Sequence, residues 1–364
     1  MEKYSIKVGI THGDINGVGY EVIIKALEDP AIFDLCTPVL YGSAKIAGFY
    51  RRALGIQQLQ HTVIESAADA RRGTINVINV VPEDLRVEPG QCTTEAGTAA
   101  FTALERAVAD LQAGAIDVLV TAPINKSNIQ SPTFQFPGHT EYLEASLGNG
   151  GEHHALMILC HESLRVALVT THLPLAQVSE KLTVNAVSRK IVEFNAALIR
   201  DFAVHCPRIA VLSLNPHSGD NGLLGTEETE VIQPAIKMAQ ELGVQAFGPY
   251  AADGLFGSGN YAKFDGVLAM YHDQGLAPFK ALSQGNGVNF TAGLPFVRTS
   301  PDHGTAFDIA GTGAADAQSM RNAIYVAMDA FRHRAVHAEA FANPLKKLYE
   351  TRGRDNVVLN LDKD

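Results

Sequence analysis

Short apolar runs rich in Val, Ile and Leu recur along the chain, and segments with helical spacing of apolar residues separate many of them. The helical segments span residues 18–27, 95–113, 184–202 and 227–242. Most of the runs are continuous, as in strands buried on both faces of a sheet. Strands that alternate with helices predict an α/β fold with a mainly parallel sheet between helical layers. The runs are IKVGI, TPVLYG, INVINVV, IDVLVTAP, HALMILC, RVALVTTH, RIAVLSL, VQAFG and FDGVLAMYHD.

One pair of runs departs from this alternation. RVALVTTH follows HALMILC after only the four residues HESL. A parallel crossover needs a dozen or more residues, so this connection predicts an antiparallel hairpin and hence a mixed sheet. Residues 316–349 have the pattern of a long helix, and residues 351–364 are expected to form a surface tail.

Composition excludes several classes of protein. The chain has 364 residues, 46% of them hydrophobic and 19% charged, which is typical of one large or two ordinary compact, soluble domains. A net charge of -10 argues against a nucleic-acid surface. The chain shows neither an N-terminal apolar leader nor an apolar run of the roughly 18 residues that span a membrane. The cysteines lie far apart, which favours a reducing cytoplasm and argues against disulfides and thiolate zinc sites: Cys36, Cys92, Cys160 and Cys206.

A glycine-rich turn, THGDINGVGYE, follows the first apolar run at residues 11–21. The glycines Gly13, Gly17 and Gly19 have the spacing G-x-x-x-G-x-G, which matches neither the dinucleotide fingerprint nor the P-loop. The spacing alone therefore predicts a strand, a tight turn and the start of a helix.

Three histidines occupy the same local position. His172, His217 and His272 each lie at or just after the end of a predicted strand. Ligands of open α/β sheets collect beyond the carboxyl ends of the strands, where three imidazoles suit an open divalent metal site. A single histidine there is more often an ordinary polar residue, but three equivalent ones favour a site. Whether all three meet within one subunit stays open.

Two further segments carry candidate ligand-binding groups. In YHDQGLAPFK, Asp273 is placed to orient His272, and Lys280 to reach an anion; the alternative is a loop with a solvated lysine. In FPGHTE, His139 and Thr140 open a predicted helix, where backbone N–H groups suit a phosphate or carboxylate. The alternative there is plain N-capping by Thr140, which needs no ligand.

The stretch from residue 284 to 316 reads as a long glycine-rich loop. It contains six glycines, the pair Asp302 and His303, and Arg298 in a mostly apolar segment. Glycine permits close approach of backbone to a ligand, and an arginine can hold a carboxylate or phosphate through two hydrogen bonds. Long loops within compact domains are usually functional unless they are disordered, so we expect a binding role.

Taken together, these motifs resemble the 4-hydroxythreonine-4-phosphate dehydrogenases of pyridoxal phosphate biosynthesis. The matches run in order from residue 9 to about residue 316. HGTAFDIAGTG also resembles the loop of isocitrate and isopropylmalate dehydrogenases that contacts the adenosine half of the cofactor. One departure is that Ile15 and Tyr20 replace two prolines of the family's N-terminal turn, so its shape is not implied. The matching segments are GDINGVGYE, VTAPINK, FPGHTEYL, TTHLPL, LNPHSGDNGLLGTEE, GPYAADGLF, MYHDQGLAPFK and LPFVRTSPDHGTAFDIAG.

The resemblance implies the site residues. The metal ligands would be His172, His217 and His272, with His272 supplied by the partner of a homodimer and one ion of Zn, Mg, Mn or Co at each site. NAD or NADP would be bound by His303, Gly304, Thr305, Ala306 and Asp308. The residues expected to bind the phosphorylated substrate are His139, Thr140, Lys280, Asn289 and Arg298, and the expected catalytic residues are Lys280, Asp253 and Asp273.

The resemblance also implies the fold and the reaction. Residues 1–125 and 295–364 would form an outer lobe on the cofactor side, and residues 126–294 a central lobe with the metal, the substrate and the dimer interface. The implied fold is like that of isocitrate and isopropylmalate dehydrogenases, with the active site in the cleft. The reaction would oxidise 4-phosphooxy-L-threonine and decarboxylate it to 3-amino-2-oxopropyl phosphate.

Three alternatives stay open. One is a dehydrogenase of 4-phospho-D-erythronate or threonate in sugar-acid catabolism, with the same metal and phosphate residues. Another is a non-catalytic, metal-dependent protein that binds phosphate esters. A phosphotransacetylase-like acyl transferase is possible at the level of the fold only, because fold does not determine function.

Overall fold

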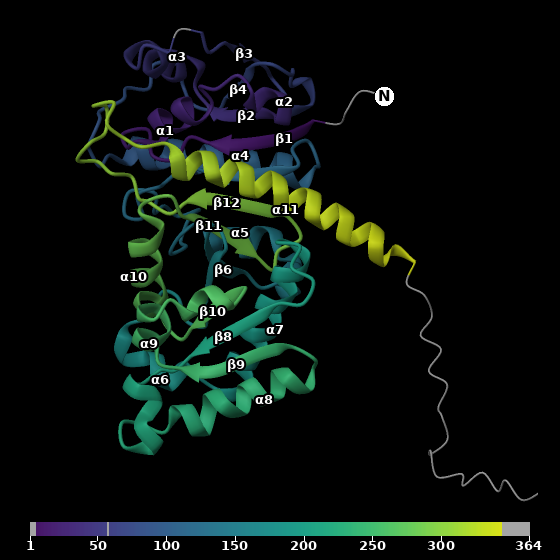
Figure 1. Cartoon of the computed structure of the whole chain (residues 1–364). Helices are drawn as coiled ribbons and strands as arrows, with labels where there is room; N and C mark the ends of the chain where they lie inside the picture. Colours follow the sequence, from purple (N-terminus) through teal and green to yellow (C-terminus); the bar gives the residue numbers. More distant parts are fainter. Residues whose placement is uncertain (1–4, 57, 344–364) are drawn as a thin grey trace, which may run out of the picture.

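A single twisted sheet of twelve strands runs the length of the molecule (Figure 1). The computed structural model describes residues 5–56 and 58–343. Within them the strands are β1 (Ile6–Thr11), β2 (Cys36–Gly42), β3 (His61–Val63), β4 (Ile75–Asn79), β5 (Val118–Thr121), β6 (Leu156–His161), β7 (Leu164–Leu168), β8 (Arg208–Leu212), β9 (Gln245–Tyr250), β10 (Gly266–Ala269), β11 (Val288–Ala292) and β12 (Val297–Pro301).

The sheet is mixed and mainly parallel, as predicted. Its strand order is β3-β4-β2-β1-β5-β12-β11-β6-β7-β10-β8-β9. The antiparallel pairs among the described strands are β12–β11, β11–β6 and β6–β7, all at the centre of the sheet. The predicted hairpin is confirmed, since β6 and β7 pair antiparallel up to His161 and Leu164.

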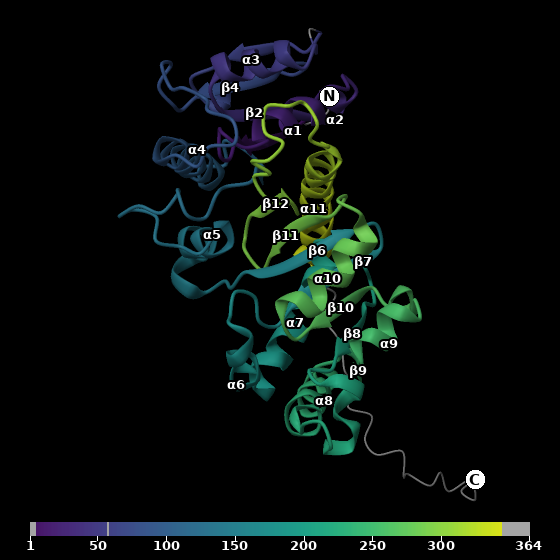
Figure 2. The same cartoon turned by 90° about the vertical axis from the view of Figure 1, so that its left-hand side faces the viewer.

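Helices cover both faces of the sheet, which confirms the expected helical layers. Figure 2 shows α4 and α5 on one side of the central strands and α11 on the other. We call the side of α4, α5 and α10 the front face and the side of α1, α7 and α11 the back face. The helices are α1 (Gly19–Ala26), α2 (Ile32–Leu35), α3 (Ala44–Ala53), α4 (Thr94–Gln112), α5 (His139–Leu147), α6 (Val178–Lys181), α7 (Val184–Arg200), α8 (Gln233–Glu241), α9 (Ala252–Gly257), α10 (His272–Ser283) and α11 (Gln318–Ala342).

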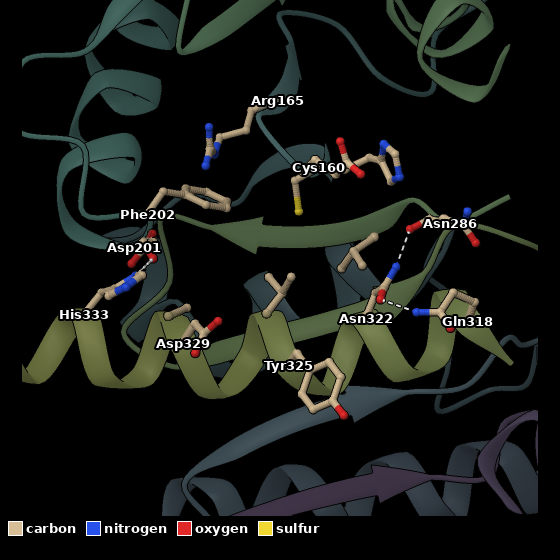
Figure 3. Close-up of a pocket in the computed structure, with 15 residues that line it drawn as sticks. Cys160, Arg165, Asp201, Phe202, Asn286, Gln318, Asn322, Tyr325, Asp329 and His333 are labelled. Atoms are coloured by element: carbon tan, nitrogen blue, oxygen red, sulfur yellow. Dashed lines mark hydrogen bonds between the residues drawn. The ribbon is translucent and has the colours of Figure 1, made fainter. Parts of the chain in front are cut away.

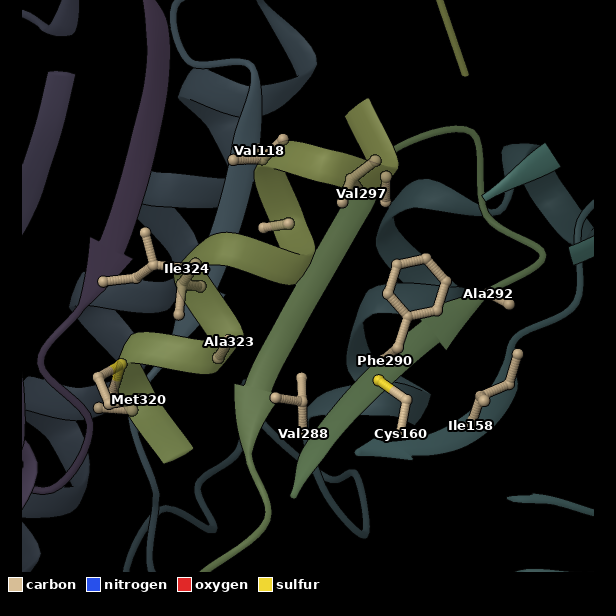
Figure 4. Close-up of a cluster of buried hydrophobic side chains, with 14 of the residues drawn as sticks. Val118, Ile158, Cys160, Val288, Phe290, Ala292, Val297, Met320, Ala323 and Ile324 are labelled. Atoms are coloured by element: carbon tan, nitrogen blue, oxygen red, sulfur yellow. The ribbon is translucent and has the colours of Figure 1, made fainter. Parts of the chain in front are cut away.

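The hydrophobic core differs between the two faces. The back face carries one cluster that extends through both halves of the sheet, and Figure 4 shows its centre, where Met320, Ala323 and Ile324 of α11 lie over Val118 and Val297. The front face carries two separate clusters, one under α4 and α5 and the other under α9 and α10. The front core is therefore interrupted over the central strands.

The predicted loop between residues 284 and 316 was wrong in its first half, because β11 and β12 lie inside it. VNFTA and VRTSP are short and contain polar residues on one face, so they lack the continuous apolar character of the other strands. The edge strand β3 was also not predicted. A π-helical turn, Glu228–Ile232, precedes α8 within the predicted helix 227–242. Residues 344–364, including the expected end of the last helix and the surface tail, lie outside the described residues.

The sheet continues without a break across the expected boundary between lobes. Residues 294 and 295 lie in the connection between β11 and β12, which are hydrogen-bonded neighbours. No helix within the described ranges combines the length and the hydropathy of a membrane span.

A buried ion-pair network ties α7 to α11 on the back face. The side chain of Asp201 has no exposed surface, and its Oδ1 lies 2.9 Å from Nε of Arg200 and 2.6 Å from Nε of Arg334. His333 lies 2.9 Å from the backbone oxygen of Asp201 through its Nδ1. Removing one member of such a network leaves the other charges uncompensated.

We therefore expect Asp201→Asn to lower the free energy of unfolding by about 3 kcal/mol, because two arginines would lose their buried carboxylate partner. Urea unfolding followed by circular dichroism measures this change. Asp329→Asn is the matched control, since Asp329 pairs with Arg332 on an exposed helix surface and its loss should cost less than about 1 kcal/mol. Equal effects of the two substitutions would contradict the structural role of Asp201.

Candidate active site

A cavity of about 270 Å³ opens on the front face, where the two front clusters leave the central strands uncovered. We call it the front cavity. It gathers segments far apart in sequence, from the end of β5 to the residues after β12. Its lining includes all five predicted substrate-binding residues together with two of the predicted metal ligands and two of the cofactor residues: His139, Thr140, Lys280, Asn289, Arg298, His172, His272, His303 and Gly304.

Strand register places the polar side chains of the central strands in this cavity. In the antiparallel pair β11–β12, Asn289 lies opposite Ser300 and Thr291 lies opposite Arg298. Opposed residues share a face of the sheet, and alternate residues share it along each strand. The neighbours Val288 and Phe290 therefore belong to the back-face core.

Arg298 is the most unusual charge of the site. Its side chain is buried at 2% exposure, and its guanidinium donates only to hydroxyls, at 2.6 Å to Oγ1 of Thr121 and at 3.1 Å to Oγ1 of Thr291. No carboxylate of the described residues lies within 4.0 Å of it. Burial lowers the pKa of Arg298 to about 9, and the charge of Glu141 opposes this shift. A buried guanidinium without a counterion is costly unless an anionic ligand supplies one.

Several buried polar atoms of the front cavity have no hydrogen-bond partner among the described residues. They are Nε2 of His139, Oε2 of Glu141, Oδ1 of Asn289 and Nε2 of His303. Buried polar atoms are normally satisfied, so such a group of unpartnered atoms in one cavity indicates a place for a polar ligand.

The start of α5 forms one wall of the cavity. Gly138 is its N-cap residue, and no side chain caps the helix. The alternative reading of Thr140 as a plain N-cap is therefore wrong, because Thr140 lies inside the first turn. Burial lowers the pKa of His139 well below 6.5, and the nearby charges of Arg298 and Lys126 lower it further, so His139 is a neutral imidazole at pH 7. The uncapped N-terminus, Arg298 and Lys126 together favour an anion.

His172 and His272 lie close together, with ring centres 6.2 Å apart. Nδ1 of His172 lies 2.8 Å from Oε1 of Glu141, and Nδ1 of His272 lies 2.8 Å from Oδ1 of Asp273. The hydrogen bond to His172 is the largest cause that lowers the pKa of Glu141. A carboxylate on Nδ1 orients an imidazole and leaves its Nε2 to a metal ion, as in many metal sites.

His217 does not join the other two histidines. It lies in the left-handed region at φ 53° and lines a separate cavity of about 460 Å³ together with Asp253. Within residues 5–56 and 58–343 no three acidic, histidine or cysteine side chains are arranged to hold a metal ion. The donor types fit a divalent metal, but one chain alone does not assemble the predicted set of three ligands.

The N-terminal glycine turn packs against the loop that is predicted to bind the cofactor. The N–H of Val18 donates to the backbone oxygen of Thr305 at 3.0 Å. A Cβ at Gly17 would lie 2.8 Å from that oxygen, and one at Gly13, whose φ is +69°, would overlap the oxygen of Pro123. The glycines therefore serve close packing of backbone on backbone, and this fits the absence of a phosphate-loop spacing. Thr305, Ala306 and Asp308 continue this loop away from the cavity-lining Gly304.

Sequence reasoning missed four residues of the site. Thr121 and Thr291 hold Arg298, Glu141 holds His172, and Lys126 lines the cavity. Lys126 and Thr121 flank the end of a predicted buried strand. The expectation that ligands collect at the carboxyl ends of strands, which selected the histidines, would therefore have selected these two residues as well. Nothing in the sequence pairs Glu141 with His172, which lies 31 positions away.

Comparisons with known proteins identify the family to which the chain belongs. The family model described as "Pyridoxal phosphate biosynthetic protein PdxA" matches residues 34–327. A 4-hydroxythreonine-4-phosphate dehydrogenase of Bacteroides thetaiotaomicron is 54% identical over 362 residues, which are 100% of this chain and 99% of that protein. A D-threonate 4-phosphate dehydrogenase of Cupriavidus necator is 41% identical over 89% of this chain and 97% of its own length.

Solved structures show the same likeness. The crystal structure of a 4-hydroxythreonine-4-phosphate dehydrogenase from Klebsiella pneumoniae superposes with a TM-score of 0.76 at 38% identity, over 91% of this chain and 99% of that one. The family model covers most of the described sheet, including the strands that build the front cavity. The chain therefore belongs to the PdxA family of pyridoxal phosphate biosynthetic proteins.

Proposed function

We propose that this chain uses NAD or NADP to oxidise 4-phosphooxy-L-threonine, whose oxidised form loses CO2 to give 3-amino-2-oxopropyl phosphate. The observation that carries the proposal is the buried guanidinium of Arg298, which has no carboxylate partner among the described residues and faces a cavity shared with His172 and His272. The high identity to a relative named for this activity supports the choice of substrate.

The phosphate end of the substrate is assigned to the positive wall of the cavity. Arg298 supplies a fixed charge, and its planar fork matches two phosphate oxygens. Thr140 and the N–H groups at the start of α5 add hydrogen-bond donors, with neutral His139 beside them. Lys280, whose Nζ lies 3.1 Å from the backbone oxygen of Asp302, and Asn289 complete the predicted set.

The amino end is assigned to Glu141. Its Oε1 bonds to His172, while its buried Oε2 has no partner among the described residues. An ammonium group would satisfy this oxygen and balance its charge. The hydroxyl of phosphoerythronate or phosphothreonate would bring no positive charge, so this observation favours the amino substrate over the sugar acids.

The metal site is proposed to be shared between two subunits of a homodimer. His172 and His217 would come from one subunit and His272 from the other, as the family resemblance implies. Within one chain His172 lies near its own His272 and His217 lines a separate cavity, so the proposal requires His172 and His217 to come together when the dimer and the metal site form. Glu141 and Asp273 orient two of these imidazoles. A bound Zn, Mg, Mn or Co ion would supply Lewis acidity toward the substrate hydroxyl.

The cofactor is assigned to the loop after β12. His303 and Gly304 line the same cavity as the substrate residues, and the unpartnered Nε2 of His303 leaves a hydrogen-bonding position beside them. Thr305, Ala306 and Asp308 extend the binding loop. NAD or NADP, when bound, would accept the hydride from the carbon that carries the substrate hydroxyl.

The proposed reaction also requires proton transfer, from the substrate hydroxyl during oxidation and to carbon after loss of CO2. Lys280 is the predicted catalytic residue that lines the front cavity, so it is the candidate to accept the hydroxyl proton or to reprotonate carbon after loss of CO2. Asp273 contacts His272 and acts as a positioning residue. Asp253 lines the His217 cavity, and a role for it in proton transfer stays a prediction.

We also propose the lobe division 1–125 plus 295–364 against 126–294, with the substrate between the lobes. The front cavity draws lining residues from both proposed lobes, since Thr121 and Arg298 belong to the outer one and His139 and Lys280 to the central one. Movement of one lobe on the other would close the cavity over the substrate and exclude water.

The first test is NADH formation by the metal-loaded protein with NAD, comparing 4-phosphooxy-L-threonine with 4-phospho-D-erythronate. We expect kcat/KM to favour the amino substrate by at least about tenfold, because Glu141 provides a counter-charge only for its ammonium. Turnover of phosphoerythronate alone would place the protein with sugar-acid catabolism. Tight binding of both substrates without NADH formation would support a non-catalytic binding protein.

Glu141→Gln provides the matched variant for this assay. It keeps the size of the side chain but removes the negative charge, so the preference for the amino substrate should decrease. An unchanged ratio of the two kcat/KM values would contradict the assignment of the ammonium to Glu141.

Arg298→Lys should lower kcat/KM by about 100-fold, because a lysine cannot keep both threonine contacts and also present two parallel donors to phosphate. Steady-state kinetics measures the effect, and the melting temperature shows whether the variant is folded. Arg189→Lys on an exposed part of α7 is the control and should leave kcat/KM unchanged. Retention of full activity by Arg298→Lys would argue against phosphate binding at this position.

His172→Ala should reduce the bound divalent metal from about one ion per chain to less than about a tenth of that amount, since it removes one of three proposed ligands. Elemental analysis of the purified protein gives this number without any assay of activity. His205→Ala, at an exposed position away from the cavity, should keep the metal. Full metal content in His172→Ala would exclude the proposed ligand set.

A further inference from the structure

A second cavity, of about 540 Å³, lies on the back face of the sheet (Figure 3). We call it the back cavity. Asn289 lies on the front face of β11, so its neighbour Val288 lies on the back face together with Cys160, which pairs with Val288 from β6. The two cavities therefore lie on opposite sides of the same strands. One face of α11 and the end of α7 complete its walls.

The interior of the back cavity has an apolar floor between polar ends. Val288, Val326 and the ring of Phe202 provide apolar surface. At one end Asn322 links Asn286 and Gln318 through hydrogen bonds, and at the other lies the Asp201 network (Figure 3). Small-molecule sites in proteins typically combine an apolar lining with a few polar groups of this kind.

Arg165 is a charged group of this cavity that makes no ion pair with any carboxylate in the described part of the chain. Its guanidinium lies 4.9 Å from the centre of the Phe202 ring, and its Nη1 donates to the backbone oxygens of Ser163 at 3.1 Å and Asp265 at 3.5 Å. Its buried Nε has no partner, and no described carboxylate lies within 4.0 Å. Burial lowers the pKa of Arg165, as burial does for Arg298, and the charge of Asp265 opposes this shift.

The carboxylates that line the back cavity do not form an ion pair with Arg165. Asp201 is held by Arg200 and Arg334, and Asp329 lies 3.0 Å from Arg332. Glu162 lies in the exposed turn of the β6–β7 hairpin. The Asp265 carboxylate attracts the guanidinium of Arg165 from beyond 4.0 Å, and its Oδ2 accepts a hydrogen bond from the backbone N–H of Arg208. Arg165 therefore resembles Arg298 in being a guanidinium at a cavity wall that is held by neutral oxygens, with no described carboxylate in direct contact.

From this arrangement we propose that the back cavity binds a small organic anion, a carboxylate or phosphate ester with a flat apolar body. The anionic group pairs with Arg165, and the apolar body lies against Phe202, Val288 and Val326. This site is distinct from the substrate site, because one layer of sheet separates them.

Isothermal titration calorimetry with benzoate and with phenyl phosphate tests the proposal on the full-length protein without NAD or substrate. Arg298→Met is the background, because it removes the proposed anion site of the front cavity. We expect binding of at least one probe at one site per chain in this background. Adding Arg165→Met should weaken that binding at least about tenfold, whereas adding Arg165→Lys should keep part of it. The probe that binds identifies whether carboxylate or phosphate suits the site.

Inorganic phosphate provides the test of the apolar floor, and it should bind at least about tenfold more weakly than phenyl phosphate. Equal affinity for the two phosphates would contradict a role for the floor, and equal probe affinity with and without Arg165 would overturn the site. Melting temperatures of all variants show whether they are folded. A further variant, Asn322→Asp, adds a negative charge to the cavity wall without changing Arg165, and it should also weaken probe binding. Because no readout involves NADH, failure here leaves the proposed dehydrogenase activity untouched.

Discussion

The functional geometry depends on the reversed direction of β11, which runs antiparallel to both of its neighbours at the centre of a mainly parallel sheet. This reversal brings residues 288–292 and 297–301 together through a short connection, so that Asn289 and Arg298 reach the same face. A parallel neighbour would have required a crossover helix over one face of these strands. Without that helix, the front face at the centre stays open and can form a cavity.

Burial of Arg298 is stabilised by neutral partners and by the ligand it is proposed to bind. Hydroxyls of Thr121 and Thr291 hold the guanidinium in place but do not neutralise it. Burial lowers the pKa of His139, and the charge of Arg298 lowers it further, so that imidazole stays neutral. An anion that enters the cavity meets a fixed positive charge and needs little rearrangement of the protein, which is the arrangement that gives strong electrostatic binding.

The sequence predicts a feature well when that feature leaves a pattern among neighbouring residues, and poorly when it depends on contacts between distant residues. The strands with continuous apolar runs and their helices were predictable because burial on both faces leaves a local pattern. β11 and β12 were not, because their alternate residues line a cavity and their apolar content is accordingly low. The expectation that ligand-binding residues follow the ends of strands selected His172 and His272, whose rings lie close together. It also selected His217, which lies elsewhere because its loop contains left-handed residues that the local sequence does not predict.

The excess of acidic residues makes the unpaired arginines informative. The chain has 39 acidic and 29 basic residues, so carboxylates are not scarce. Where a buried arginine serves the fold, as Arg334 does, a carboxylate lies 2.6 Å from it. Arg165 and Arg298 instead have only neutral oxygen partners and line cavities on opposite faces of the same strands. Arg298 is buried and Arg165 is partly buried. A charge that is removed from water without a carboxylate in contact destabilises the fold, and the anions proposed for the two cavities would offset that cost.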